Sequence, residues 1–233
     1  MKKYDRLVTN GCSFVNGVGL IRSQDEKEFG HYLSQKLECE HLNLSKKGSS
    51  NSRIFRTTFE YLSEKKDDES VLLIIGLSHW ARYELYSVES NNYFCHFKEL
   101  FETTKSKGCH IGGKWYSKKY LTELQNFYEG HFASIPSGNH YIKQNVLPLN
   151  SYSKEKNVDL VVFGSLVEIT EDFFDGVVTY DMNGALSWWD YLNLKENALP
   201  APSKWLTDCR HPSHDAHKEM SNLLFNFLGD NNG

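Results

Sequence analysis

A serine near the N-terminus and an aspartate and a histidine near the C-terminus have the types and spacing that acyl transfer needs. Ser13 follows Gly11 and Cys12 directly after a short apolar run, and Asp208 precedes His211 by three residues. A serine hydroxyl becomes a nucleophile when an imidazole takes its proton, and a carboxylate that fixes the imidazole tautomer improves that base. We therefore predict Ser13 as nucleophile, His211 as general base and Asp208 as the group that orients His211.

Acyl transfer also needs hydrogen-bond donors for the oxyanion that develops on the substrate. Backbone N–H groups that follow a glycine or begin a helix provide such donors at little reorganisation cost. The Ser13 amide and Gly48 suit this role, and the side chain of Asn51 could supply a third donor. We predict an oxyanion hole built from Ser13, Gly48 and Asn51.

The elements that must position these residues alternate between strands and helices. Short β-type runs at 6–9, 41–44, 70–77, 159–164 and 177–180 predict strands, and apolar residues at helical spacing predict helices at 28–37, 54–62 and 214–228. The helix at 54–62 should begin at a serine cap, and Ser213 should cap the last helix. This alternation predicts a doubly wound α/β sheet with parallel strands. Ligands of such sheets bind beyond the carboxyl ends of the strands, which is where the candidate residues lie.

The stretch at 80–157 has no strong strand pattern and is rich in Lys, Tyr and Phe. We predict helices at 118–131 and 141–154 in it, as a helical elaboration inserted after the third strand. No Pro/Gly/Ser-rich linker borders the stretch, so we expect residues 1–233 to form a single domain.

The motifs at the two ends resemble a known family, the SGNH (GDSL-like) serine hydrolases. Gly-Cys-Ser at 11–13 resembles the Gly-Asp-Ser block of that family with Cys in place of Asp. Gly48 resembles its second-block glycine, and Asp208-x-x-His211 resembles its terminal block. The resemblance implies a three-layer α/β/α sandwich around a parallel, flavodoxin-like sheet. It also implies esterase, lipase, thioesterase or carbohydrate O-deacetylase activity on a small-molecule or carbohydrate ester, without metal or organic cofactor.

One block departs from the family pattern. The third block of the family offers Gly-x-Asn-Asp, whose Asn donates to the oxyanion, whereas the third strand here ends in Gly76, Leu77, Ser78 and His79. Asn51, Ser78 or His79 could substitute for the missing Asn. Loss of one such donor lowers the rate about a hundredfold or more, so slow or selective hydrolysis is one expectation. The variant with Gly-Cys-Ser-Phe at 11–14 and Gly-Ser-Ser-Asn at 48–51 is similar to small bacteriophage proteins, which implies a viral or bacterial origin.

Charge and cysteine usage exclude several function classes. Lys and Arg total 26 against 30 Asp and Glu, and no long basic run is present, so nucleic acid is not expected as a partner. The five cysteines are scattered with no CxxC pair, which predicts free thiols in a reducing, cytoplasmic compartment, the host cytoplasm if the protein is viral. No apolar run has the length of a signal-peptide core or a membrane span. The sequence indicates no oligomeric state.

Other readings of the same residues stay open. A zinc site is one alternative, although the spacing of the candidate ligands matches no metal motif: they are His211, His214 and His217 with Cys209 and Asp208. Ser78, His79 and Arg82 lie at the end of the third strand and are predicted to bind substrate, and Arg82 could clamp a carboxylate or phosphate.

Four further residues lie close to the predicted site in the sequence. Lys46 and Lys47 would draw an anionic substrate toward Gly48, although they also suit a solvated surface. Trp188 and Trp189, expected in the loop before Asp208, could line a pocket or simply pack.

Two further functions compete with ester hydrolysis. An acyltransferase would use the same serine with an alcohol in place of water. A binding protein on a hydrolase scaffold is the other alternative. The joint presence of Ser13, Asp208 and His211 argues against it, because a scaffold needs none of them.

Overall fold

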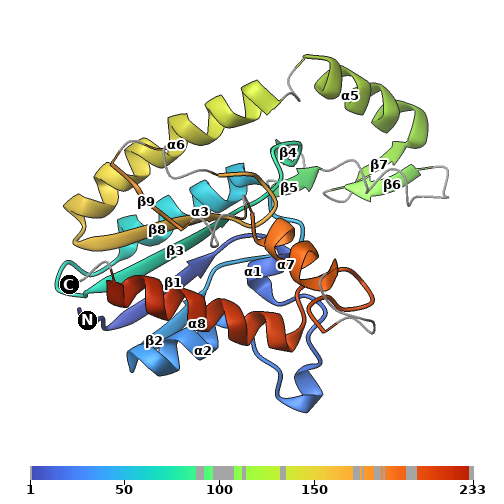
Figure 1. The fold of residues 1–233 in the computed structure, drawn as a ribbon. Coiled ribbons are helices and arrows are strands. Elements are labelled where there is room, and N and C mark those ends of the chain that lie inside the picture. Colours follow the sequence, from blue (N-terminus) through green and yellow to red (C-terminus); the bar gives the residue numbers. More distant parts are fainter. Residues whose placement is uncertain are drawn as a thin grey trace.

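A five-stranded parallel sheet forms the centre of the protein in a computed structural model (Figure 1). The structure describes residues 2–87, 92–96, 108–111, 114–131, 135–169, 174, 176–180, 185, 187–197 and 204–230. The strands lie in the order β2-β1-β3-β8-β9. Their bounds are Arg6–Asn10 for β1, Glu40–Asn43 for β2, Val71–Leu77 for β3, Val158–Gly164 for β8 and Val178–Tyr180 for β9.

This strand order confirms the predicted doubly wound, flavodoxin-like arrangement. From β1 the chain crosses to β2 on one side and later returns to place β3 on the other side of β1. The order therefore reverses at β1 and β3, and the crevice beyond their carboxyl ends is where such sheets bind ligands. Ser13 follows β1 and Ser78 follows β3, so the topology brings both to this crevice.

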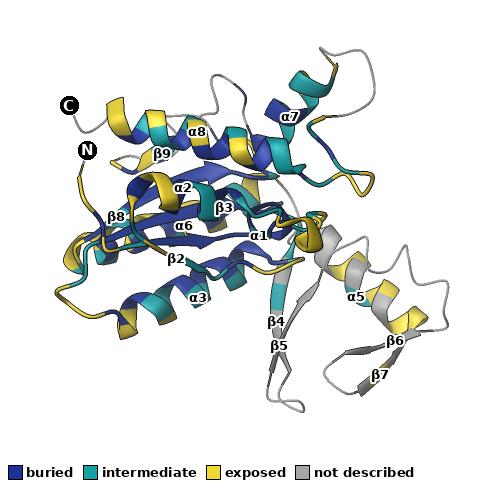
Figure 2. Ribbon diagram, turned by 90° about the horizontal axis from the view of Figure 1, so that it is seen from below, coloured by how far each residue is buried: buried dark blue, intermediate teal, exposed yellow. Residues whose placement is uncertain are grey.

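Helices cover both faces of the sheet, which makes three layers (Figure 2). One face is covered by α2 (Phe29–Leu37), α7 (Trp188–Asn197) and α8 (His214–Asp230), and the other by α3 (Asn51–Glu64) and α6 (Ile135–Glu155). Successive β3 residues alternate between the two cores: Leu72 and Ile74 pack toward α2 and α8, and Leu73 and Ile75 toward α3 and α6. Both faces of β3 are buried, which explains its continuous apolar sequence.

Both predicted serine caps are present. Ser50 Oγ accepts a hydrogen bond from the Arg53 amide at 3.2 Å at the start of α3. Ser213 Oγ accepts one from the Ala216 amide at 3.2 Å at the start of α8. Each cap satisfies a backbone donor that has no partner within its own helix, so these serines fix where the two helices begin.

The expectation of a purely helical elaboration at 80–157 needs correction. The predicted helices are present as α5 (Lys118–His131) and α6, but two antiparallel hairpins precede them. Their strands are β4 (Tyr83–Ser87), β5 (Asn92–His96), β6 (Gly108–Ile111) and β7 (Lys114–Ser117). Their residues show no sustained alternation of apolar and polar side chains, so the sequence pattern predicted no strand there.

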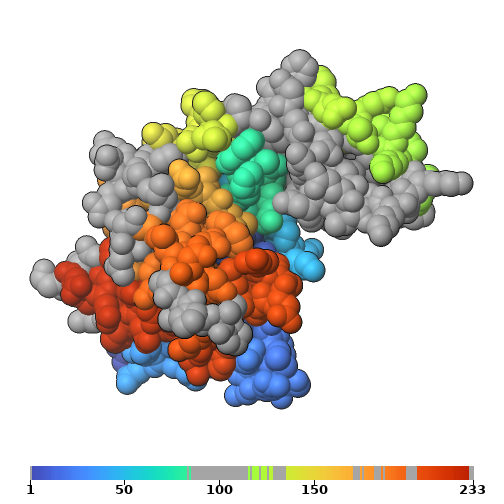
Figure 3. All heavy atoms as spheres, turned by 45° about the vertical axis from the view of Figure 1, so that its right-hand side comes forward, coloured from blue at the N-terminus to red at the C-terminus, as the bar shows by residue number. Residues whose placement is uncertain are grey.

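The elaboration is attached to the sheet domain through α3 and the end of β3. Arg56 of α3 makes a bidentate ion pair with Glu84 of β4, with both N–O distances at 3.0 Å. Gly138 of α6 lies against Trp80, so closely that a Cβ there would stand 2.5 Å from the Trp80 Cβ. In Figure 3 the described parts of β7 and α5 lie at one end of the molecule, away from α8. Within the described residues, no helix combines the length and apolar character needed to cross a bilayer.

Candidate functional site

The turn that carries Ser13 is fixed to α3 by one buried side chain. Asn10, the last residue of β1, is fully buried, and its Nδ2 donates to the Ile54 carbonyl at 3.0 Å and to Thr58 Oγ1 at 2.9 Å. Its Oδ1 accepts from the Gly11 amide at 2.9 Å. All polar atoms of this side chain are thus used to hold the turn, and buried polar groups with complete hydrogen bonding rigidify their surroundings.

Gly11 allows the same turn to approach β3. A Cβ at this position would lie 2.3 Å from Val15 Cγ2 and 2.9 Å from the carbonyl oxygen of Gly76. Ser13 then begins the single-turn helix α1 (Ser13–Asn16) and is 4% exposed. No hydrogen bond to its hydroxyl is present among the described residues. Ser13 therefore lies at the carboxyl end of β1 with its hydroxyl uncommitted to the fold.

The predicted base lies on a tight turn between α7 and α8. The Thr207 amide donates to the His211 carbonyl at 2.8 Å, and the His211 amide donates to Thr207 Oγ1 at 3.2 Å. Arg210 occupies the left-handed region with φ +58. Within this turn His211 Nδ1 lies 3.0 Å from the carbonyl oxygen of Cys209. A carbonyl only accepts, so Nδ1 carries the hydrogen and Nε2 keeps its lone pair.

The structure brings His211 to the serine turn. Its ring lies 5.7 Å, centroid to centroid, from the ring of Phe14, the residue after Ser13. Ser13 and His211 are not hydrogen-bonded to each other in this structure. Catalytic hydrogen bonds are often long before substrate binds, so this arrangement is compatible with proton transfer between the two residues.

Asp208 is not paired with His211 in the structure. Its side chain is exposed, and within the described part of the chain no hydrogen bond joins it to the imidazole, whose Nδ1 faces Cys209 instead. The charged groups that act on His211 are Lys47 and Arg82. The orienting role of Asp208 stays a prediction.

The environment of His211 favours its neutral form. Burial lowers the pKa of His211 below its ordinary value, and the positive charges of Lys47 and Arg82 lower it further, whereas the hydrogen bond to the Cys209 carbonyl opposes the shift. A general base must be neutral to accept a proton. The side chain is therefore held in its base form over most of the physiological pH range.

The loop that carries Gly48 lies beside the Ser13 turn. The Lys46 amide donates to the Gly11 carbonyl at 3.3 Å, and the Ser49 amide to the Lys46 carbonyl at 3.1 Å. Gly48 has φ +73, a left-handed conformation that favours glycine. This sequence thus folds the second predicted oxyanion residue into a turn next to the first.

The Asn51 side chain is hydrogen-bonded to the main chain of Ser78, a contact that was not predicted. Its Nδ2 donates to the Ser78 carbonyl at 2.9 Å, and its Oδ1 accepts from the Ser78 amide at 2.8 Å. The side chain is 3% exposed, in the first turn of α3. It therefore joins the end of β3 to the start of α3. Its role as an oxyanion donor stays a prediction.

The three residues predicted to bind substrate fold back over the end of β3. The Arg82 amide donates to the His79 carbonyl at 3.1 Å, and Arg82 Nη1 donates to Ser78 Oγ at 3.2 Å. His79 Nδ1 accepts from the Ala81 amide at 3.1 Å, and its ring lies 5.0 Å from that of Trp80. Ser78 is fully buried, whereas Arg82 is half-buried.

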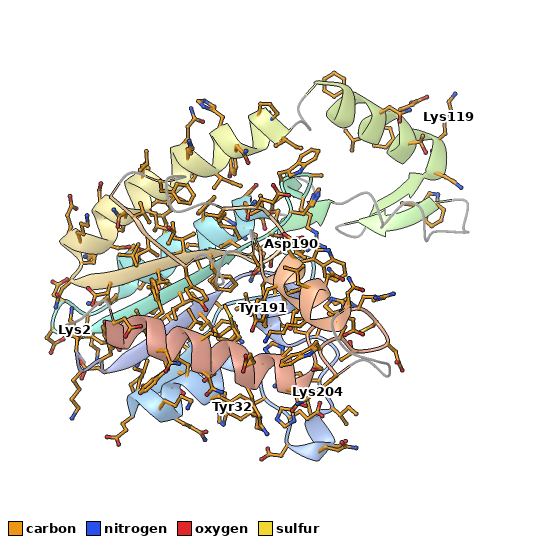
Figure 4. All side chains as sticks on the ribbon, in the orientation of Figure 1. Lys2, Tyr32, Lys119, Asp190, Tyr191 and Lys204 are labelled. Carbon is orange, nitrogen blue, oxygen red and sulfur yellow. The ribbon has the colours of Figure 1, made fainter. Side chains whose placement is uncertain are left out.

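The expectation that Trp188 and Trp189 lie in a loop is wrong, because they begin α7. Trp188 is 1% exposed and its ring lies 5.8 Å from that of Phe14, with the Trp189 ring at 6.0 Å. The Tyr191 hydroxyl, labelled in Figure 4, donates to Glu219 of α8 at 3.2 Å. The tryptophans thus pack α7 against the helical turn that carries Ser13.

The two histidines that follow His211 make hydrogen bonds with residues of α2. His214 Nε2 lies 2.5 Å from the Tyr32 hydroxyl, and the fully buried His217 accepts a hydrogen bond from the Phe29 amide at 3.1 Å through Nδ1. Among the described residues, no group of three or more His, Cys, Asp and Glu side chains is arranged to hold a metal ion.

Sequence reasoning missed three features that shape the site: the Asn10 side chain, Thr207 and the Cys209 carbonyl. An Asn-Gly pair, as at 10–11, is typical of a turn and does not by itself indicate a buried amide. In the fold the Asn10 amide donates to the hydroxyls of Thr57 and Thr58 of α3. These residues are far from Asn10 in the sequence, so the contact could not be predicted from it. A backbone carbonyl leaves no trace in residue identity.

Comparisons with solved structures find chains of similar length. One is a member of the lipolytic protein G-D-S-L family from Veillonella parvula, at 8% identity and TM-score 0.49, with 94% of each chain covered. Another is a lipase from a goat rumen metagenome, at 13% identity and TM-score 0.48, covering 94% of this chain and 95% of the other. A third is a GDSL-like lipase from Bacteroides thetaiotaomicron, at 12% identity and TM-score 0.42, covering 97% and 88%.

At these identities the likeness concerns the backbone alone. No protein with a curated description matches the sequence. A family described as "Family of unknown function (DUF6071)" matches residues 14–179, which is most of the chain. The chain belongs to the DUF6071 family.

Proposed function

We propose that the protein is a serine ester hydrolase of the esterase or O-deacetylase type, with Ser13 as nucleophile and His211 as general base. The observation that carries this proposal is the convergence of the two residues from opposite ends of the chain. Ser13 begins α1 beyond β1, and the ring of His211 lies against the neighbouring Phe14, with Nδ1 on a carbonyl and the Nε2 lone pair available. Imidazole in this tautomer is the form that accepts a serine proton.

The proposed reaction has two halves. Ser13 Oγ attacks the ester carbonyl while His211 Nε2 takes its proton, and the oxyanion accepts hydrogen bonds from the amides of Ser13 and Gly48. Collapse breaks the bond between the acyl carbon and the alcohol oxygen, and Nε2 returns its proton to that oxygen. Water then attacks the acyl-enzyme by the same proton path, which releases the acid and restores Ser13.

A fluorophosphonate probe should label Ser13, because an activated serine attacks phosphorus as it attacks a carbonyl carbon. In-gel fluorescence of the labelled band should disappear in Ser13→Ala and in His211→Ala, whereas Ser45→Ala, a change at a buried serine of the loop before Gly48, should keep it. If the folded wild-type protein stays unlabelled where a control hydrolase reacts, Ser13 is not an activated nucleophile and the binding-protein alternative gains.

The pH profile should show the environment of His211. We expect kcat/KM to rise with pH through one ionisation below about 6.5, because the neutral imidazole is active and both burial and nearby positive charge lower its pKa. Lys47→Gln should move this ionisation toward the ordinary value, and high salt should do the same by screening. A profile that rises through an ionisation above the ordinary value in wild type would contradict the assignment of His211 as base.

A further inference from the structure

Five residues next to the serine turn form a closed ring of hydrogen bonds. They come from four segments that lie apart in the sequence: the end of α1, the start of a short 3₁₀ helix, the residue before α2, and the end of β2 with the loop that follows it. The members of the ring are, in chain order, Asn16, Arg22, Glu28, Asn43 and Ser45. Each is bonded to two others, and such a connected polar network holds its members in one arrangement.

Arg22 joins the end of the serine helix to the start of α2. Its Nη1 donates to Glu28 Oε2 at 2.8 Å, and its Nη2 donates to the Asn16 carbonyl at 3.1 Å. Burial alone would raise the pKa of Glu28, but hydrogen bonds that include those from Arg22 and Asn43 lower it. The carboxylate is therefore ionised at neutral pH and makes charge-assisted bonds, which are stronger than bonds between neutral groups.

The other half of the ring joins Glu28 to the loop after β2. Asn43 Nδ2 donates to Glu28 Oε1 at 3.2 Å, and Asn43 Oδ1 accepts hydrogen bonds from the amide of Ser45 at 3.0 Å and from its hydroxyl. Asn16 Nδ2 then donates to the Ser45 carbonyl at 3.0 Å, which closes the ring. Ser45 takes part through its main chain, so the loss of its hydroxyl alone leaves the ring closed.

This loop also pairs with the chain that follows β1. The Leu44 amide donates to the Thr9 carbonyl at 2.8 Å, and the Lys46 amide donates to the Gly11 carbonyl at 3.3 Å. These bonds continue the parallel pairing of β1 with β2 beyond the strands, and the second of them ends at Gly11. The helix α1 begins after that point.

The Asn16 side chain attaches α1 itself to the loop. A helix of one turn has little stability of its own, so contacts from outside determine where it lies. The Asn16 amide provides such a contact to the loop that leads to Gly48, and Arg22 provides another to the end of α1. The ring therefore fixes the position of the Ser13 turn relative to the Gly48 loop.

In the proposed reaction the amides of these two segments act on the same atom. The oxyanion accepts hydrogen bonds from the Ser13 amide, at the start of α1, and from the Gly48 amide, in the loop. Donors stabilise an oxyanion when they are already aimed at its position, and a misplacement of about 1 Å lowers the rate about 10²-fold. Contacts that set these two segments relative to each other thus affect the rate.

We propose that Asn16 and Asn43 are positioning residues of the oxyanion site, which act through the ring on the main-chain amides of Ser13 and Gly48. This inference rests on the proposed hydrolase function and adds to it two residues that act without touching the substrate.

Asn16→Ala opens the ring at the bond to the loop. Two measurements follow the oxyanion site: kcat/KM for 4-nitrophenyl acetate, and the inhibition constant of phenylboronic acid, whose boron binds Ser13 Oγ and places an oxygen at the oxyanion position. We expect kcat/KM to fall about tenfold or more and the inhibition constant to rise by a similar factor. Asn150→Ala is the matched control and should change neither, because this half-buried side chain donates to the Gly176 carbonyl at 3.0 Å, before β9 begins, at the opposite edge of the sheet.

Exchange of two partners in the ring gives a second test. Asn43→Asp places a carboxylate against Glu28 and should lower kcat/KM and weaken the binding of phenylboronic acid. In the double variant Asn43→Asp with Glu28→Gln, the new amide at position 28 donates to the new carboxylate at position 43, which still accepts from the Ser45 amide. The bond is restored with donor and acceptor exchanged, so we expect most of the lost rate and affinity to return.

The number of active sites separates positioning from general destabilisation. Labelling with the fluorophosphonate, followed to its end point, counts the folded protein that carries a reactive Ser13. A variant that only unfolds in part loses labelled sites, while the sites that remain keep the wild-type inhibition constant. A positioning residue has the opposite signature: Asn16→Ala should be labelled completely, at a lower rate, and should bind phenylboronic acid more weakly.

The outcomes that overturn the inference differ from those that overturn the hydrolase. Wild-type kcat/KM and inhibition constant in fully labelled Asn16→Ala, or a double variant as impaired as Asn43→Asp, would show that the ring does not position the oxyanion donors, while hydrolysis stands. A fall in labelled sites with an unchanged inhibition constant would show the same. If wild type turns over no ester and the fluorophosphonate leaves Ser13 unlabelled, the hydrolase proposal fails and the positioning roles fail with it.

Discussion

His211→Ala is expected to lower kcat/KM by about 10⁴-fold or more, whereas Asp208→Asn should lower it by less than about tenfold. The two expectations differ because Nδ1 of His211 is bonded to the Cys209 carbonyl, while the Asp208 carboxylate is exposed to solvent. A carboxylate bonded to the imidazole would cost about 10⁴-fold on amidation, since the amide favours the wrong tautomer. Steady-state hydrolysis of an activated acetate ester measures both changes.

Ser13→Ala and thermal unfolding provide the controls for this pair. His211→Ala and Asp208→Asn both lie on a surface turn, so the unfolding temperature should change little. A fall in rate then reports on the chemistry. A large loss in Asp208→Asn, comparable with that in His211→Ala, would restore the carboxylate as the orienting group. In that case Asp208 must reach Nδ1 in the complex with substrate, and the contact with the Cys209 carbonyl belongs to the free protein.

Mild acid should destabilise the protein through His217. This residue is fully buried, and burial lowers its pKa to about 3. Between that value and about 6.5 the unfolded chain binds a proton that the folded protein does not, so stability is lost as pH falls through this window. From about pH 7.5 to about pH 5 the expected loss from His217 is about 2 kcal/mol, measured by urea unfolding.

His217→Asn is the matched variant, because its amide oxygen can accept the Phe29 N–H but does not titrate. Burial also lowers the pKa of His41 and of His211, so some loss of stability in acid should remain in the variant. Glu28 contributes to the loss of stability only at lower pH. Burial alone would raise its pKa, but hydrogen bonds led by that from Arg22 lower it, so its contribution fades only below about 4.5. An equal slope in both proteins over the milder range would exclude His217 as the cause.

The sheet was predictable from the sequence because its strands carry strong local signals. Val71–Leu77 is apolar on both faces and fully buried. The serines that cap α3 and α8 indicate where those helices begin. The hairpins β4–β5 and β6–β7 were missed because their short strands show no sustained alternation of apolar and polar residues. A Gly-Gly pair at 112–113 between two short runs was a hairpin signal that the sequence did contain.

The candidate site was predictable at the level of residue types and much less at the level of contacts. Ser13, Gly48 and His211 lie at the end of the sheet where the alternation of strands places them. The sequence pattern predicted Asp208 as the group that orients His211. In the structure His211 Nδ1 lies against the Cys209 carbonyl, in a turn where Arg210 is left-handed. Gly and Asn are the residues that usually indicate this conformation. Because the residue here is Arg210, the local sequence did not predict the turn.

The bonds between Asn51 and Ser78 bear on the timing of the proposed reaction. The Asn51 side chain joins α3 to the end of β3 through its Oδ1 and one Nδ2 hydrogen bond. If it keeps only this role during the reaction, the oxyanion charge is left to backbone donors. Fewer donors slow the attack of water on the acylated serine as well as its formation, and an activated ester compensates only for formation. With such an ester the enzyme should accumulate in its acylated form. Phenol release would then begin with a burst of about one equivalent per site before a slow steady state, and the lifetime of the acyl group would set the turnover.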